Sequence, residues 1–211
     1  MIQVAQQPEP PNFDALVRQP GTRFLAVNPH PTRDEWKGRD YWRHISDQLY
    51  SVYKGICAYL GEWFSKPAKS VDHFIPKSVA PTLAYEWGNY RLTSTLINNY
   101  KDNDTNIVDP FTVQLGWFVL DLPSCLIKPG TSLSSSIMSM VTNTINVLKL
   151  NDNDDLVQNR CNILKEYANG DVAFIFLRNH YPYIAAELER QGAVETVKSM
   201  FVLNQTILPS P

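Results

Sequence analysis

Three neighbouring stretches decide the fold of this chain: Val71-Asp72-His73-Phe74-Ile75-Pro76-Lys77-Ser78, Glu86-Trp87-Gly88-Asn89 and Asn98-Asn99-Tyr100-Lys101. Their pattern predicts a strand over about residues 70–75, a turn closed by Pro76, a second short strand or irregular segment near 83–85, and a helix over about 87–101. Asn89 follows His73 by 16 positions, and Asn98 follows Asn89 by 9. The sequence therefore predicts a strand, a strand and a helix that carry an Asp-His pair and two Asn residues.

These residue types suit the hydrolysis of a phosphodiester bond with one metal ion. The reaction needs an activated water and a divalent ion that neutralises charge on the phosphate. A neutral imidazole is basic enough at cellular pH to take a proton from water. Mg²⁺ accepts one or two protein oxygens and takes its other ligands from water and phosphate, so one carboxylate and one amide oxygen are a sufficient protein contribution. Adjacent residues of a strand alternate faces, however, so Asp72 and His73 should not both point straight into one cleft.

The spacing resembles that of the HNH, or ββα-metal, endonucleases. This resemblance implies that His73 is the general base, that Asp72 and Asn98 are the metal ligands, and that the Asn89 amide ties the loop between the strands to the helix and orients the base. It also resolves the alternation, because in this family the Asp reaches the metal from the strand end and the His reaches the phosphate from the adjoining turn. Asn99 competes with Asn98 for the ligand position, and only the spacing favours Asn98.

Three basic residues near the motif are expected to bind nucleic acid. Lys77 follows Pro76 in a rigid turn, as in many members of the family, and Lys101 lies one helical turn after Asn98. Arg91 lies between the two Asn residues. Each part of the motif also has a plainer interpretation: an Asp-His pair is usually a surface or capping arrangement, an Asn pair before a lysine is usually a solvated helix face, and Trp87 is more often a core residue than a platform for a base.

One feature departs from the family branch that the chain most resembles, in which two Cys-x-x-Cys pairs hold a structural zinc. Here the corresponding positions read Cys57-Ala58-Tyr59-Leu60 and Ser94-Thr95-Leu96-Ile97, so three of the four thiolates are missing. Tetrahedral structural zinc needs four ligands. We therefore expect no structural zinc, and we expect Leu60 and Ile97 to pack together as an apolar replacement.

At 211 residues and 44% hydrophobic, the chain can bury a full core and is expected to form one compact unit. The motif with its flanking helical patterns predicts an α+β, mainly helical fold. The sequence has no run of roughly twenty apolar residues that would span a membrane and no signal-peptide pattern at its start. The three cysteines, at positions 57, 125 and 161, are an odd and widely spaced set that does not suggest a disulfide framework. These features favour a cytoplasmic protein.

Charge is distributed unevenly along the chain, although the formal net charge is only −2. Residues 1–101 contain 12 Lys or Arg against 9 Asp or Glu, and residues 102–211 contain 7 against 12. Eleven of these 12 basic residues are expected around the motif: Arg18, Arg23, Arg33, Lys37, Arg39, Arg43, Lys66, Lys69, Lys77, Arg91 and Lys101. Because the overall basicity is weak for a nucleic-acid-binding protein, we expect a partner to help deliver the substrate.

Outside the motif, the sequence predicts three parts. Residues 1–33 contain six prolines and are expected to form an extended arm over the domain. Residues 34–110 hold the nuclease core and a preceding helix over about 35–58, capped by Asp34. Residues 111–211 are expected to be a scaffold with a strand in 113–120 and helices over about 132–148, 156–167 and 172–190.

The motif also resembles the small bacterial HNH proteins that accompany an ATPase in Septu-like anti-phage systems and certain retrons. That resemblance implies cleavage of DNA or RNA with Mg²⁺ or Mn²⁺, directed by a partner ATPase. Two alternatives remain: a catalytically inactive HNH-like binding or assembly subunit, and a restriction or homing enzyme. The chain has no obvious room for the specificity domain that a restriction or homing enzyme would need.

Overall fold

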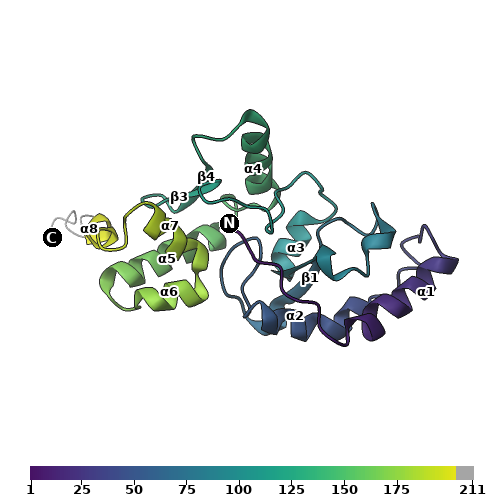
Figure 1. The fold of residues 1–211 in the computed structure, drawn as a ribbon. Coiled ribbons are helices and arrows are strands. Elements are labelled where there is room, and N and C mark those ends of the chain that lie inside the picture. Colours follow the sequence, from purple (N-terminus) through teal and green to yellow (C-terminus); the bar gives the residue numbers. More distant parts are fainter. Residues whose placement is uncertain (203–211) are drawn as a thin grey trace.

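The computed structural model describes residues 1–202, and it has an α+β fold in which helices surround two small antiparallel sheets (Figure 1). The α-helices are α1 (Gln19–Val27), α2 (Ser46–Val52), α3 (Thr95–Lys101), α4 (Ser135–Val147), α5 (Asp154–Asn169), α6 (Phe174–His180), α7 (Pro182–Arg190) and α8 (Val197–Val202). The strands are β1 (Lys69–His73), β2 (Tyr90–Ser94), β3 (Phe118–Asp121) and β4 (Leu126–Pro129). A π-helix precedes α1 (Asp14–Arg18), and 3-10 turns span Tyr41–Ile45, Lys66–Ala68, Pro81–Leu83 and Trp87–Asn89.

The first sheet pairs β1 with β2, and α3 follows β2 directly. The register sets Asp72 opposite Arg91 and His73 opposite Tyr90. The predicted order of strand, strand and helix is present, but the predicted position of the second strand was wrong: residues 81–83 form a 3-10 turn, and β2 lies in a segment expected to be helical. The helix begins only at Thr95, where the Ser94 hydroxyl accepts a hydrogen bond from the Ile97 amide as an N-cap.

Two predictions for the N-terminal third were wrong. The extended arm is limited to about the first ten residues, since residues 14–27 are helical, with Pro20 tolerated in the first turn of α1. The long helix predicted over 35–58 is instead a 3-10 turn followed by the short α2. This helix ends at Val52 because Lys54 and Gly55 both have positive φ angles, 55° and 69°, which no right-handed helix contains.

The C-terminal part agrees better with the predicted elements. The helices expected over 132–148 and 156–167 are α4 and α5, and the Asn153 side chain caps α5 by accepting from the Leu156 amide. The single helix expected over 172–190 is divided into α6 and α7 at Pro182. The cysteine spacing did not suggest a disulfide framework, but it gave no sign of the single disulfide that is present, between Cys125, next to β4, and Cys161 of α5.

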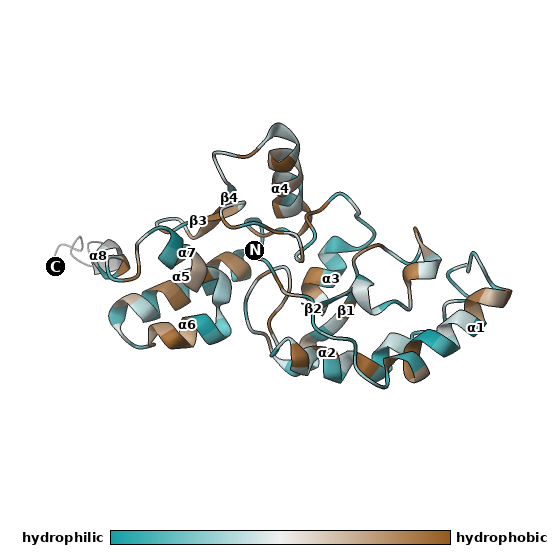
Figure 2. Ribbon diagram, in the orientation of Figure 1, coloured by the Kyte–Doolittle hydropathy of each residue, from teal (hydrophilic) through white to brown (hydrophobic). Residues whose placement is uncertain are grey.

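The hydrophobic interior consists of two clusters, and the β1–β2–α3 unit lies between them. Val71 and Leu92 of the sheet pack with the N-terminal helices and with Trp36, Trp42 and Trp87, so Trp87 is a core residue. Ile97 of α3 packs instead with the C-terminal helices. In Figure 2 the helices on both sides of this unit carry apolar and polar residues along their length. Among residues 1–202, no helix combines the length and apolar character needed to cross a bilayer.

Candidate functional site

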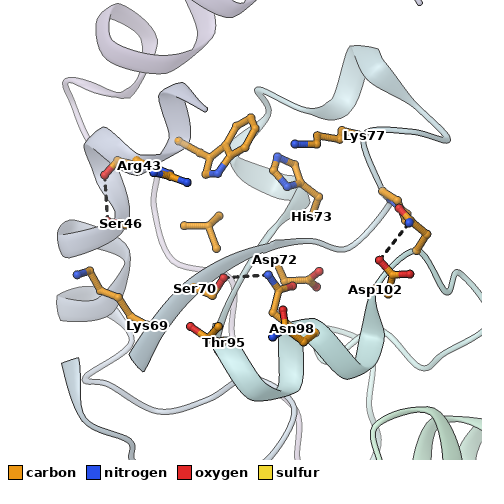
Figure 3. A pocket seen from close by; sticks show the side chains of 15 residues that line it. Arg43, Ser46, Lys69, Ser70, Asp72, His73, Lys77, Thr95, Asn98 and Asp102 are labelled. Carbon is orange, nitrogen blue, oxygen red and sulfur yellow. Dashed lines mark hydrogen bonds between the residues drawn. The ribbon is translucent and has the colours of Figure 1, made fainter. Parts of the chain in front are cut away.

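A cavity of about 850 Å³ opens beside β1, and both Asp72 and His73 line it (Figure 3). Its other walls come from the turn before α2, from the segment after Pro76, and from α3 with the residues that follow it. The lining side chains are Trp42, Arg43, Ser46, Lys69, Ser70, Val71, Asp72, His73, Pro76, Lys77, Thr95, Asn98, Asn99, Asp102 and Asn103. The cavity therefore unites three of the four predicted catalytic and metal-binding residues, despite the alternation of Asp72 and His73 along the strand.

The His73 imidazole is held in one orientation and one tautomer. Its Nε2 lies 2.9 Å from the Ala84 carbonyl oxygen, which can only accept, so Nε2 carries the proton and Nδ1 carries the lone pair. The rings of Trp42 and Tyr90 pack edge-on against it, at centroid distances of 4.5 Å and 5.2 Å. Burial lowers the pKa of His73 to about 4, and the nearby positive charges of Lys77 and Lys101 act in the same direction. At neutral pH the ring is therefore an uncharged base.

Asn98 of α3 lines the same cavity and lies near Asp72 and Ser70 (Figure 3). Its amide nitrogen donates a 2.8 Å hydrogen bond to the Ser70 hydroxyl on β1. This bond fixes the orientation of the amide group and leaves the Oδ1 oxygen without a partner among residues 1–202. Asn98 is half-buried and Asn99 is exposed. A rigid amide oxygen beside a carboxylate is a donor pair that fits a hard divalent cation.

The Asp72 carboxylate is almost completely buried, with 2% of the residue exposed. Its Oδ1 lies 3.1 Å from the Lys101 ammonium, and its Oδ2 accepts a hydrogen bond from the Tyr59 hydroxyl. Burial raises the pKa of Asp72, whereas Lys101 and Tyr59 oppose that shift. The two donors satisfy one acceptor site on each oxygen, and each oxygen keeps a second lone pair.

Asn89 ends the loop between the two strands and does not line the cavity. Its Oδ1 accepts from the Ile75 amide at 2.8 Å, and its Nδ2 donates to the carbonyl oxygens of Ile75 and Leu83, at 2.9 and 3.1 Å. Leu83 precedes Ala84, whose carbonyl holds His73. Asn89 therefore joins Ile75 to Leu83 within the loop and holds the segment that carries the acceptor of His73. The expected tie between this loop and the following helix is not among its bonds, because α3 begins only at Thr95.

Two of the three predicted nucleic-acid contacts are not available at the surface, and these predictions were wrong. The Lys101 side chain is fully buried against Asp72, and the Arg91 guanidinium, 3% exposed, forms a two-pronged ion pair with Asp109 at 2.7 and 2.9 Å. Both side chains are used inside the protein. Lys77 does line the cavity, where its ammonium lies 4.7 Å from the Trp42 ring centroid and 5.1 Å from that of Trp36.

Sequence reasoning missed the specific roles of Arg43, Lys69, Ser70 and Tyr59. Arg43 and Lys69 had been grouped with the other basic residues, but among residues 1–202 only these two and Lys77 bring a Lys or Arg side chain to the cavity wall. The position of Lys69, three residues before Asp72, is the one local signal that could have identified it. Tyr59 gave no signal, because its contact with Asp72 depends on how the turn after Cys57 folds onto β1.

Cys57 and Leu60, which sequence reasoning compared with zinc-binding positions, lie in a compact turn. Ser94 and Ile97, the other two positions compared, lie at the start of α3. The Cys57 carbonyl accepts from the Gly61 amide at 2.8 Å, and the Cys57 thiol contacts the Thr93 hydroxyl at 3.4 Å. Cys57, Leu60 and Ile97 are buried in the same apolar cluster, and Ser94 caps α3. The turn therefore retains its packing contacts to β2 and α3 with one thiol.

Comparisons of the sequence with protein-family models and with curated proteins found no match.

Proposed function

We propose that this protein is a metal-dependent endonuclease of the HNH type, which hydrolyses phosphodiester bonds in nucleic acid. One observation carries the proposal: a neutral His73, with its Nδ1 lone pair free, shares a cavity with the oxygens of Asp72 and Asn98. A base, a carboxylate and an amide oxygen are the protein groups that one-metal phosphodiester hydrolysis requires.

Each residue has a distinct role in this proposal. His73 Nδ1 accepts a proton from the attacking water, while the Ala84 carbonyl stabilises the positive charge that the ring then gains. Asp72 and Asn98 would hold a divalent ion, Mg²⁺ or Mn²⁺, which when bound neutralises charge on the phosphate. Asn89 acts through the loop by positioning His73. Lys77, Arg43 and Lys69 contact phosphates along the cavity wall.

The biological setting follows from the resemblance of the motif and rests on it alone. We propose that the protein acts in defence against phage together with a partner ATPase, on DNA or RNA. The net charge of −2 is consistent with a nuclease that receives its substrate in an assembled complex, because three cations at one cavity provide only weak steering at physiological salt.

Cleavage assays test the nuclease proposal. Purified protein is incubated with plasmid DNA and with total RNA, in Mg²⁺ or Mn²⁺ and in EDTA. His73→Ala should reduce cleavage by roughly 100-fold to 10,000-fold, the usual contribution of a general base. His30→Ala, which removes an exposed histidine that does not line the cavity, should leave the rate unchanged. Cleavage that persists at the wild-type rate in His73→Ala would refute the assigned base.

A second function is favoured by one observation, the burial of Asp72 against Lys101 and Tyr59. Such a network is also expected in an assembly subunit that keeps the fold of a nuclease without its activity. The two functions differ in a direct way. An inactive subunit would bind its partner, and the complete complex would still not cleave nucleic acid in Mg²⁺ or Mn²⁺.

A further inference from the structure

The cation nearest to the Asp72 carboxylate belongs to the protein itself. Lys101 Nζ lies 3.1 Å from Asp72 Oδ1 and 3.1 Å from the His73 carbonyl oxygen, and its side chain is fully buried. The aromatic ring of Phe74 lies 5.9 Å from the same ammonium. A carboxylate oxygen, a backbone carbonyl oxygen and an aromatic ring thus surround Lys101 Nζ, as they could surround a bound cation.

This pairing changes how the site attracts a metal ion. Ionised Asp72 and Lys101 together have no net charge, and Asn98 is neutral. A divalent ion that approaches Asp72 is attracted by the negative charge of the carboxylate. It is also repelled by the ammonium of Lys101, which lies 3.1 Å from the carboxylate oxygen. Both forces are strong because the two groups are buried. In the part of the chain that the structure describes, the only other acidic side chain that lines the cavity is the exposed Asp102. A phosphodiester group would add one negative charge and further hard oxygens.

We infer that Lys101 is the resident counter-cation of Asp72, so that the site takes up a divalent ion strongly only together with a nucleic-acid phosphate. This inference rests on the proposed nuclease function. It makes Lys101 a positioning residue that couples two ligands: by linkage, the metal tightens the binding of nucleic acid by the same factor by which nucleic acid tightens the binding of the metal. A consequence is that the protein without nucleic acid does not hold a divalent ion, so its site is completed only when a phosphodiester group is bound.

The thermal stability of three proteins tests the first half of the inference. Wild-type protein should show almost no rise in Tm when Mn²⁺ is added without nucleic acid. Lys101→Met keeps the length of the side chain but leaves a buried carboxylate without its counter-charge, so it should be destabilised in EDTA. Mn²⁺ should then raise the Tm of Lys101→Met by about 5 °C or more, when its concentration is roughly 100 times the dissociation constant.

The double variant Lys101→Met, Asp72→Asn is the matched control. It removes both charges, so it should be more stable in EDTA than Lys101→Met and should not respond to Mn²⁺. A large rise in the Tm of the wild-type protein with Mn²⁺ alone, or an equal response of Lys101→Met and the double variant, overturns the inference.

Oligonucleotide binding tests the second half and does not depend on whether Lys101→Met folds. A labelled single-stranded or duplex oligonucleotide is titrated with His73→Ala, which cannot use the assigned base, in Mn²⁺ and in EDTA. We expect Mn²⁺ to tighten binding at least about tenfold, which lies within the usual range of coupling between two ligands. Binding that Mn²⁺ leaves unchanged, or no binding in either condition, overturns the inference and leaves the nuclease proposal in place, because that proposal is decided by the cleavage assays.

Discussion

Two asparagines, Asn89 before β2 and Asn151 before α5, hold the backbone in the same way in two regions of the molecule. Asn89 accepts from the Ile75 amide and donates to the Ile75 carbonyl, at 2.8 and 2.9 Å, and Asn151 does the same with Ile127, at 2.9 and 2.8 Å. Only Asn89 also bonds the segment that orients His73. The comparison teaches that an asparagine bonded to both the amide and the carbonyl of one residue stabilises the backbone. Its importance for function depends on whether the stabilised segment contacts a functional side chain such as His73.

Buried charges differ between the two regions in a similar way. In the C-terminal region, Arg160 donates to the carbonyl oxygens of Cys125 and Leu150, and Glu187 accepts from the Leu120 amide. These groups join backbone segments and line no part of the cavity beside β1. Asp72, the partner of buried Lys101, instead lines the cavity next to His73. A buried charge far from the cavity indicates architecture, whereas a buried carboxylate that lines a cavity together with a base indicates chemistry.

The largest effect is expected from removing the side-chain hydrogen bonds of Asn89 and of Asn151 in two parallel variants. Asn89→Ala leaves the amide and carbonyl of Ile75 without partners, whereas the Leu83 carbonyl keeps the Glu86 amide. Asn151→Ala leaves the same two groups of Ile127 without partners. Each variant should therefore reduce the free energy of unfolding by about 4 kcal/mol. Urea unfolding measures both. Cleavage per folded molecule should fall at least about 100-fold in Asn89→Ala and remain normal in Asn151→Ala. Equal activity of the two variants would contradict the positioning role of Asn89.

The next effect concerns the C-terminal region alone. The disulfide between Cys125 and Cys161 closes a segment with a sequence separation of 36, so its removal should lower the free energy of unfolding by about 3 kcal/mol. The variant Cys125→Ala, Cys161→Ala should unfold at lower urea concentration and show unchanged cleavage of nucleic acid by the remaining folded protein. Cys57→Ala is the control for the loss of a thiol, because Cys57 is not in the disulfide. Loss of activity in the double variant without loss of stability would contradict the separation of the two regions.

Glu62 gives a pH dependence at the boundary between the regions, since it follows the Cys57 turn and accepts a hydrogen bond from Asn159 of α5. Burial raises the pKa of Glu62 to about 7, above its ordinary value. The folded protein therefore favours the protonated acid, and this contribution to stability is fully present below about pH 4.5 and is lost as the pH rises through about 7. Glu62→Gln should remove this dependence and be more stable than wild type at pH 9, by up to about 3 kcal/mol.

Urea unfolding of wild type and Glu62→Gln at pH 5 and pH 9 measures the effect. The difference between the two proteins isolates Glu62 from the other titrating groups. An equal difference at both pH values would contradict the raised pKa.

The smallest effect compares two lysines that each pair with an aspartate. Lys69 bonds Asp47 and lines the cavity, and Lys128 bonds Asp121 in the C-terminal region. Lys69→Ala should weaken oligonucleotide binding by roughly threefold to tenfold and reduce the salt dependence of binding by about one phosphate contact, whereas Lys128→Ala should change neither. Fluorescence titrations at several salt concentrations measure both, and the same loss in both variants would argue against a phosphate contact at Lys69.

Part of the fold could be predicted from local signals. The helices α4 and α5 were expected nearly at their observed bounds, since caps such as Asn153 act on neighbouring residues. The position of β2 could not be predicted, because the segment 74–89 is held as a loop by Asn89 rather than by its own propensity. The Cys125–Cys161 disulfide likewise depends on the packing of β4 against α5, which leaves no local signal.

The sequence by itself determined the identity and spacing of Asp72, His73, Asn89 and Asn98, and hence the chemistry that the site can support. It also determined that Lys101 shares a helix face with Asn98. Only the tertiary structure decided that this face covers β1 instead of solvent, so that Lys101 neutralises the buried carboxylate of Asp72. It likewise decided that Arg91 pairs with Asp109, whereas Arg43, Lys69 and Lys77 line the cavity. The physical reason is that sequence periodicity places a side chain on one face of a helix or strand. Whether that side chain is buried, and which charged group it then pairs with, depends on segments far away in the chain. The tautomer of His73 depends on such a segment in the same way.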